Sequence, residues 1–206
     1  MMDSAPENIQ KSNFTFPQSQ PYQARFMKTP LQRHCAFFDR DQDGVISMTD
    51  TFRGLRALGY NWMFCLLGVA FIHLTMSYQT SPSWIPSLSM PIYLDRIERC
   101  RHGSSTKAYD YEGNVVSYPA VQSVFTRFDH ENKGGLNVSE LAWMIWNLRD
   151  SYDLFGWIMS AAWWIALFVM AADKRGILSQ EVMLSQYDGS IFYALERQQQ
   201  QSKKEI

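Results

Sequence analysis

The sequence predicts a mainly α-helical fold, and three observations lead to this prediction. Apolar residues recur at helical spacing before two acidic loops, over 31–38 and 121–128. Two further segments, 62–78 and 154–172, are apolar and free of charged residues, and prolines cluster directly after the first. The predicted architecture is a degenerate EF-hand pair with an inserted apolar segment and a proline knot, plus a C-terminal helical region.

The first acidic loop has the twelve-residue spacing of a calcium-binding EF-hand loop. Carboxylates occupy positions 1, 3 and 5, and Gly44 follows at position 6, where such a loop turns sharply. The predicted metal ligands are Asp39, Asp41, Asp43, the backbone carbonyl of Val45, Ser47 through its hydroxyl or a water, and Asp50. Asp50 is one methylene shorter than the usual bidentate glutamate, so we expect weaker calcium binding or more tolerance of magnesium.

The helix that leads into this loop carries a histidine on its apolar face. Thr29 and Pro30 are suited to the N-cap and the first helical position. His34 then lies in a stripe whose other members are Leu31, Cys35 and Phe38. A buried imidazole needs a partner, because an unpaired buried polar group costs about 1–3 kcal/mol.

Composition limits the classes of function. The chain has 206 residues, 46% of them hydrophobic, and a formal net charge of −1, so we expect no nucleic-acid partner. Three cysteines without a pattern indicate a reducing compartment. Residues 1–28 are polar and have no apolar signal-peptide core, so we expect a mobile tail there.

The two apolar segments leave alternatives open. Pro82, Pro86 and Pro91 surround Trp84 and Ile85 directly after segment 62–78, and prolines spaced this closely cannot continue a helix. This pattern favours a segment that dips into a lipid surface and returns, or a buried core helix with a proline-rich loop. Segment 154–172 is a transmembrane candidate by hydropathy, with a core helix or an interfacial helix as equal alternatives.

A second, eroded loop follows Asp129. It has Lys133 at position 5, where a ligand oxygen belongs, so we expect little or no calcium binding there. Its expected role is structural, with Leu136 paired against Ile46 in a short two-stranded ribbon. Residues 172–181 resemble a shortened third calcium loop.

The remaining histidines have more ordinary expected roles. We expect a helix over 91–102, with His102 in its last turn and Gly103 as a left-handed cap, and a solvent-facing imidazole favoured by the helix dipole. His73 is expected to pack between helices, and His130 to be exposed. These patterns divide the chain into a tail (1–28), a calcium-binding EF-hand (29–61), an apolar lipid-interacting segment with the proline knot (62–91), a C-terminal helical region with the degenerate EF-hand (92–196) and a disordered tail (197–206).

From about residue 31 to 196 the sequence resembles the caleosins, also called peroxygenases. The matching pieces are Leu-Gln-Arg-His-Cys-Ala-Phe-Phe-Asp at 31–39, Thr-Phe-Arg-Gly-Leu-Arg-Ala-Leu-Gly-Tyr-Asn at 51–61, the proline cluster that ends with Pro91-Ile-Tyr, Arg-His-Gly-Ser at 101–104, Asp-Leu-Phe-Gly-Trp at 153–157 and Tyr-Asp-Gly-Ser-Ile-Phe at 187–192. So many matches in the same order are far more specific than an EF-hand loop alone.

The resemblance implies an enzyme that binds Ca2+ and haem b. Such an enzyme transfers an oxygen atom from a fatty-acid hydroperoxide to an unsaturated fatty acid, as an epoxide, or to another co-substrate. It implies a phospholipid surface as partner, on lipid droplets and the cytoplasm-facing endoplasmic reticulum membrane, and leaves a homo-oligomer open. The positions that match the family's haem histidines are His34 and His102. One would ligate iron while the other completes the axial pair or moves protons.

Three departures from the family pattern affect these expectations. Asp50 replaces the usual glutamate, Leu88 stands where the proline knot commonly has another proline, and Trp163 replaces a commonly charged residue. The alternative function is a non-catalytic, calcium-responsive coat or tether of lipid droplets.

Overall fold

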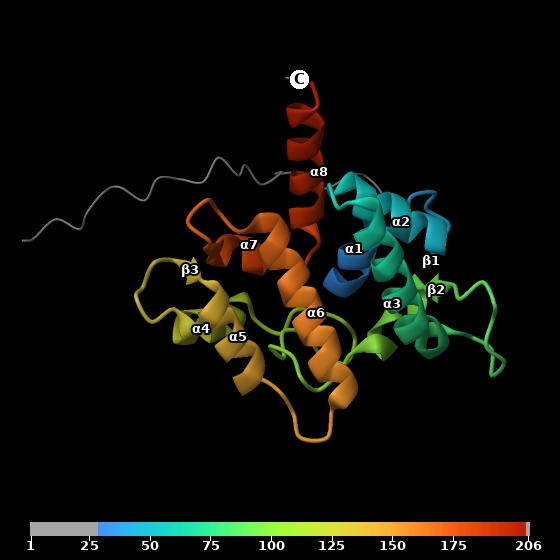
Figure 1. Cartoon of the computed structure of the whole chain (residues 1–206). Coiled ribbons are helices and arrows are strands. Elements are labelled where there is room, and N and C mark those ends of the chain that lie inside the picture. The colour runs from blue at the N-terminus through green and yellow to red at the C-terminus, as the bar shows by residue number, and fades with distance from the viewer. Residues whose placement is uncertain (1–28, 205–206) are drawn as a thin grey trace, which may run out of the picture.

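The computed structural model describes residues 29–204, which form a mainly helical fold (Figure 1). The α-helices are α1 (Pro30–Ala36), α2 (Met48–Ala57), α3 (Trp62–Thr80), α4 (Tyr118–Phe128), α5 (Val138–Asn147), α6 (Leu154–Ala171), α7 (Gln180–Ser185) and α8 (Ser190–Ser202). A 3-10 helix, η2, covers Leu94–Cys100, and the strands are β1 (Val45–Ile46), β2 (Ile92–Tyr93), β3 (Gly135–Leu136) and β4 (Leu178–Ser179). The expected tail over 1–28 lies outside the described residues.

Two short strand pairs join the helices of the described chain into two units, the first running from α1 to η2 and the second from α4 to α7. In the described residues β1 pairs antiparallel with β2, with Ile46 opposite Ile92, and β3 pairs antiparallel with β4, with Leu136 opposite Leu178. The prediction that Leu136 pairs with Ile46 is therefore wrong. Each acidic loop pairs instead with the next helix–strand–helix unit along the chain. The loop before β2 has no acidic spacing that identifies it as a partner, whereas the loop before β4 lies in residues 172–181, the segment that resembles a shortened third calcium loop.

The segment around His102 also differs from its prediction. Ile92 and Tyr93 belong to β2, so the helix begins only at Leu94 and is a 3-10 helix that ends at Cys100. His102 therefore follows the helix instead of lying in its last turn. Gly103 is not among the glycines with positive φ, so it forms no left-handed cap.

The hydrophobic core is divided between the two units. The larger cluster joins α4, α5, α6, α7 and α8 with Phe37 after α1, Leu58 after α2 and Ala108 before α4. Its best-buried members are Phe37, Phe125, Leu136, Met144, Leu178, Met183 and Ile191. The smaller cluster lies between the calcium-type loop, β2 and η2, and consists of Cys35, Ile46, Ile92, Leu94 and Ile97. Helix α1 contributes to the smaller cluster and is followed directly by Phe37, so it connects the two units.

Helices α3 and α6 expose their apolar faces. The described residues contain these two helices as candidate membrane spans by length and hydropathy, and only 17% and 22% of their most apolar windows are buried. The side chains turned inward include the polar residues His73, Ser77, Thr80 and Ser160. The exposed side chains are apolar and recur at helical spacing, namely Met63, Leu67, Leu74 and Tyr78 on α3 and Leu154, Ile158, Ile165 and Val169 on α6. Neither segment is therefore a fully buried core helix, although α6 contributes Trp164 and Leu167 to the larger core cluster.

Helix α8 continues into the segment expected to be a disordered tail. It runs to Ser202, and its glutamines and arginine have good helix propensity. Arg40 pairs with Glu196 at 2.8 Å, and the side chain of Gln199 lies against Gly59. Contacts with the first unit therefore support helix where composition alone indicated disorder.

Candidate functional site

The first acidic loop brings three carboxylates together. Single carboxylate oxygens of Asp39, Asp41 and Asp43 all lie within 4.8 Å of one another. Gly44 takes a positive φ of 82°, and its N–H donates to Asp39 Oδ2 at 3.0 Å. The backbone of this loop thus has the sharp turn that the spacing predicts.

Asp39 has the electrostatics of a cation ligand. Its side chain is buried, and its Oδ1 has no hydrogen-bond partner within the described residues. Burial, with smaller contributions from the neighbouring Asp43 and Asp41, raises the pKa of Asp39, although backbone hydrogen bonds oppose the shift. An unpaired buried carboxylate oxygen beside two further carboxylates fits a hard cation such as Ca2+, which prefers oxygen ligands. The residues present therefore fit the expected metal.

Asp50 has a second role at position 12. One of its carboxylate oxygens, Oδ2, accepts the N–H of Ser47 at 3.2 Å and also contacts the Ser47 hydroxyl. The two residues form a capping box that begins α2. Because the cap engages one oxygen, this geometry agrees with a weaker, single-oxygen ligand at this position.

Lys133 occupies the centre of the second loop. Its Nζ lies 2.6 Å from Glu140 Oε1 and 3.3 Å from Asp129 Oδ1, which are the carboxylates at positions 1 and 12. Burial raises the pKa of both carboxyl groups, but hydrogen bonds from Lys133 and from backbone amides outweigh it and lower both pKa values. The ammonium group thus lies where a metal ion would, which supports the prediction that this loop binds little or no calcium.

His34 is held in one tautomer by the turn before α8. Its Nδ1 contacts the backbone carbonyl of Gln186, and its ring packs against Trp163 and Phe192 with centroid distances of 4.9 and 5.0 Å. A carbonyl only accepts, so Nδ1 carries the proton and Nε2 keeps its lone pair. Burial lowers the pKa of His34 in spite of the opposing hydrogen bond to Gln186 and the charge of Asp188. The neutral form, which is the ligating form of imidazole, is therefore favoured.

A glycine allows this turn to approach the histidine. Gly189 has a φ of +77°, and a Cβ on it would lie 2.8 Å from both Arg33 O and His34 Cα. The buried side chain of Gln186 accepts a hydrogen bond from Trp163 Nε1 at 2.7 Å, which fixes the turn from the other side. Sequence reasoning gave no role to Gln186. The neighbouring Tyr-Asp-Gly-Ser motif was a signal for the turn but not for its contact with His34.

His102 is partly buried and has an unsatisfied nitrogen. Its Nδ1 is shielded from solvent and has no hydrogen-bond partner among residues 29–204. The ring lies 6.2 Å from Phe155 of α6, so the solvent-facing alternative is wrong. Burial lowers the pKa of His102, and the nearby charge of Asp153 opposes this shift.

Both expected haem histidines therefore lie against α6. Their ring contacts, Phe155 and Trp163, are eight residues apart, or about 12 Å along a helix axis. The donor set fits a haem in two respects. His34 has an oriented tautomer, as metal-ligating histidines usually do, and His102 has a buried nitrogen that lacks a partner.

The other histidines have the roles expected of them. His73 is fully buried, and its two ring nitrogens bond to Thr51 Oγ1 at 2.8 Å and Met90 O at 2.7 Å. It is thus a packing residue with no nitrogen left for a metal. His130 is exposed.

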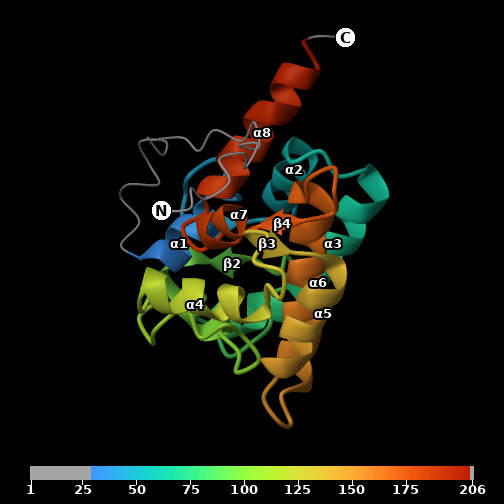
Figure 2. The same cartoon turned by 90° about the vertical axis from the view of Figure 1, so that its left-hand side faces the viewer.

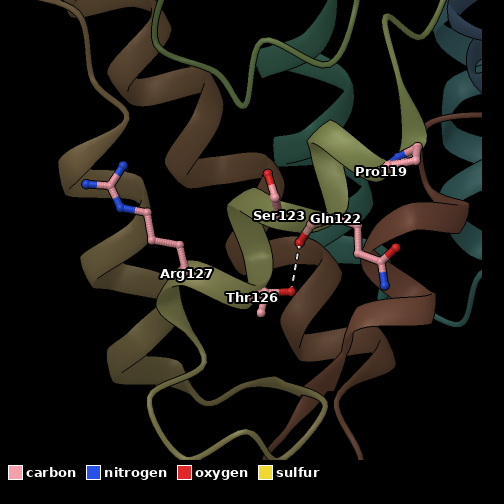
Figure 3. Close-up of a pocket in the computed structure, with 5 residues that line it drawn as sticks. All are labelled: Pro119, Gln122, Ser123, Thr126 and Arg127. Carbon is pink, nitrogen blue, oxygen red and sulfur yellow. Dashed lines mark hydrogen bonds between the residues drawn. The ribbon is translucent and has the colours of Figure 1, made fainter.

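A hollow on α4 is not part of this site. It is lined by Pro119, Gln122, Ser123, Thr126 and Arg127 (Figure 3). The residues that line it include neither His34 nor His102, and they come from two turns of a single helix. We assign it no role.

Comparison with known proteins agrees with the expectation from sequence. A sequence profile described as "Caleosin related protein" matches residues 27–196. The chain is 36% identical to a protein named peroxygenase from Lilium longiflorum, over 81% of this chain and 70% of the relative. It is 34% identical to probable peroxygenase 4 of Arabidopsis thaliana, over 82% and 86% of the two chains.

A more distant relative has a different name. The chain is 27% identical to a probable inactive peroxygenase-like protein of Arabidopsis thaliana, over 73% of this chain and 71% of the relative. No solved structure shows a significant match. With a profile match over residues 27–196 and two relatives above 30% identity across most of its length, the chain belongs to the caleosin family.

Proposed function

We propose that this protein is a calcium-binding haem peroxygenase. It takes one oxygen atom from a fatty-acid hydroperoxide, and the hydroperoxide is thereby reduced to the alcohol. The oxygen atom is added to an unsaturated fatty acid, which becomes an epoxide, or to another co-substrate. The observation that carries the proposal is the oriented imidazole of His34, whose Nδ1 donates to Gln186 O and whose Nε2 keeps a lone pair. Family membership and two relatives named as peroxygenases support the reaction class.

In this proposal His34 and His102 have different tasks. Haem b, when bound, supplies the iron that reacts with the hydroperoxide. His34 would hold the iron through Nε2, and the rings of Trp163 and Phe192, which pack against this imidazole, would keep water from it. His102, whose Nδ1 is buried without a partner among the described residues, would supply the proton that the departing oxygen needs.

Calcium has a structural task in the same proposal. Each strand pair joins two helix–strand–helix units, and this supports an arrangement like that of paired EF-hands. Loop 39–50 would hold Ca2+, while Lys133 replaces the ion in loop 129–140. The predicted first ligand, Asp39, is five residues beyond His34, so a bound ion orders the end of the segment that presents the imidazole.

A phospholipid surface is the proposed partner. Helices α3, α5 and α6 lie along one side of the molecule (Figure 2). On that side α3 and α6 present apolar stripes, while their polar side chains face inward. Trp84, Ile85 and Leu88 of the proline-rich loop are also exposed, and burial of such a side chain contributes about 1.5–3 kcal/mol.

Because one stripe of each helix packs on the protein, this face suits contact with a lipid surface better than a bilayer span. Lipid droplets and the cytoplasmic face of the endoplasmic reticulum are the proposed locations.

The decisive experiment combines a spectrum with an activity assay. Purified protein is supplied with haemin, and its Soret band and its hydroperoxide-dependent epoxidation of oleic acid are measured. We expect His34→Ala to lose both, and His102→Ala to keep most of the band but lose turnover. His130→Ala, at an exposed histidine, is the matched control and should behave as the wild type.

A second function remains in competition because one relative is named as inactive. A non-catalytic, calcium-responsive droplet coat would need the apolar face but not the histidines. A wild-type protein that stays colourless with haemin, yet binds phospholipid-coated droplets, would support the coat and overturn the enzyme.

A further inference from the structure

The partner of the calcium-type loop is an apolar loop. In a pair of EF-hands the two metal loops lie side by side through their short strands. Here β1 of loop 39–50 pairs with β2, and the segment before β2 is the proline-rich loop 81–91. This loop extends away from the body of the molecule (Figure 1) and exposes Trp84, Ile85 and Leu88 at 93%, 78% and 99%. An exposed apolar loop thus takes the place of the second metal loop.

The downstream end of the apolar loop is attached directly to the calcium-type loop. Val45 lies opposite Tyr93, and Ile46 opposite Ile92. Just beyond the strand, the N–H of Leu94 donates to the carbonyl of Gly44 at 3.0 Å. The backbone that would close around a cation therefore also positions the residues at which the apolar loop ends.

His73 forms a second connection between the two loops. Its Nδ1–H donates to the carbonyl of Met90 at 2.7 Å, and its Nε2 accepts from the hydroxyl of Thr51 at 2.8 Å. Thr51 follows Asp50, the last predicted ligand, and Met90 lies next to Pro91 with a φ of +44°. A buried side chain thus links the residue of α2 that directly follows the calcium-type loop to the strained end of the apolar loop.

We propose that a cation in loop 39–50 strengthens the binding of loop 81–91 to a phospholipid surface. The connection runs through the β1–β2 pair and through Thr51, His73 and Met90. A cation that orders loop 39–50 also fixes the two connections to the apolar loop. The exposed side chains of the apolar loop are then positioned before they bind lipid, so binding costs less conformational entropy. This inference rests on the proposed calcium and lipid partners but needs no oxygen transfer.

Thermodynamic linkage makes the proposal quantitative. If Ca2+ increases the affinity for lipid by some factor, lipid must increase the affinity for Ca2+ by the same factor. Couplings of this kind are commonly 5–150-fold, and we expect about tenfold here. The test uses triolein droplets coated with phosphatidylcholine, with binding measured in Ca2+ and in EGTA. Calcium affinity is then measured by calorimetry with and without droplets.

Variants separate the coupling from the two binding events. Thr51→Val keeps the side-chain shape but removes the hydroxyl that bonds to His73. The factor by which Ca2+ raises the affinity for lipid, and the equal factor by which lipid raises the affinity for Ca2+, should therefore fall towards one, while calcium and lipid are still bound. Thr75→Val is the matched control, because within the described part of the chain the Thr75 hydroxyl donates to carbonyls of its own helix, those of Phe71 and Ile72. Asp39→Asn should abolish the calcium dependence of lipid binding.

Equal lipid binding in Ca2+ and EGTA, or weaker binding in Ca2+, would overturn the proposal. So would a Thr51→Val protein with undiminished coupling. None of these results bears on the haem spectrum or on epoxidation, so loss of the proposed enzyme activity and loss of this coupling are separate outcomes.

Discussion

Lys133 offers the sharpest test of how the second loop is held together. Its ammonium group contacts Glu140 and Asp129, and all three side chains are at most 14% exposed. Lys133→Met keeps most of the side-chain volume but leaves two buried carboxylates without their cation. Removing one partner of a buried ion pair costs about 3–5 kcal/mol.

The expected cost is at the lower end of that range. Asp129 still accepts from the backbone amides of Lys133, Gly134 and Gly135, and Glu140 from two others. We therefore expect a loss of about 3 kcal/mol, which is a fall in Tm of about 6–12 °C for a chain of this length. Calorimetric or circular-dichroism melting measures it.

The pH dependence gives an internal check. The folded-state pKa values of Asp129 and Glu140 are lowered, so their stabilising contribution is present at neutral pH and is lost in acid, as the pH falls through those lowered values. The stability difference between wild type and Lys133→Met should therefore narrow in acid. Lys174→Met, at an exposed lysine in the neighbouring loop, is the control. If both variants melt at the same temperature, the internal-cation interpretation of Lys133 is refuted.

The remaining predictions use separate readouts. Lys133→Asp restores a carboxylate at position 5 and should add a second calcium-binding event in calorimetry, with a Tm that rises on adding calcium. Asp39→Asn should remove the calcium-binding event of the wild type, and a retained event would contradict the assignment of loop 39–50. Chelation should lower the Soret band of the haem-loaded protein, because the ordered loop presents His34. Gly189→Ala should destabilise by about 1–3 kcal/mol more than Gly176→Ala, since both have positive φ but only Gly189 has backbone atoms at 2.8 Å.

Features that depend on local spacing could be predicted from the sequence. The calcium-type loop is one, because twelve consecutive residues contain its turn and all its expected ligands. The start of α1 is another, and the structure confirms Thr29 as N-cap and Pro30 as first residue. Family membership also followed from ordered motifs and is confirmed by the profile match.

Only the tertiary structure decided which parts meet. Segments this rich in apolar residues offer more than one face that could be buried, so the sequence left the orientation of α3 and α6 open, and packing turned their few polar residues inward. Strand partners depend on which units lie together, and the loop before β2 carries no trace of a metal-binding pattern.

The contact of His34 with Gln186 joins residues 152 positions apart. Lys133 lies at the centre of the second loop because the folded loop brings the carboxylates of Asp129 and Glu140 to its ammonium group. Local spacing thus determined where ligands and caps occur, whereas long-range packing decided what each of them touches.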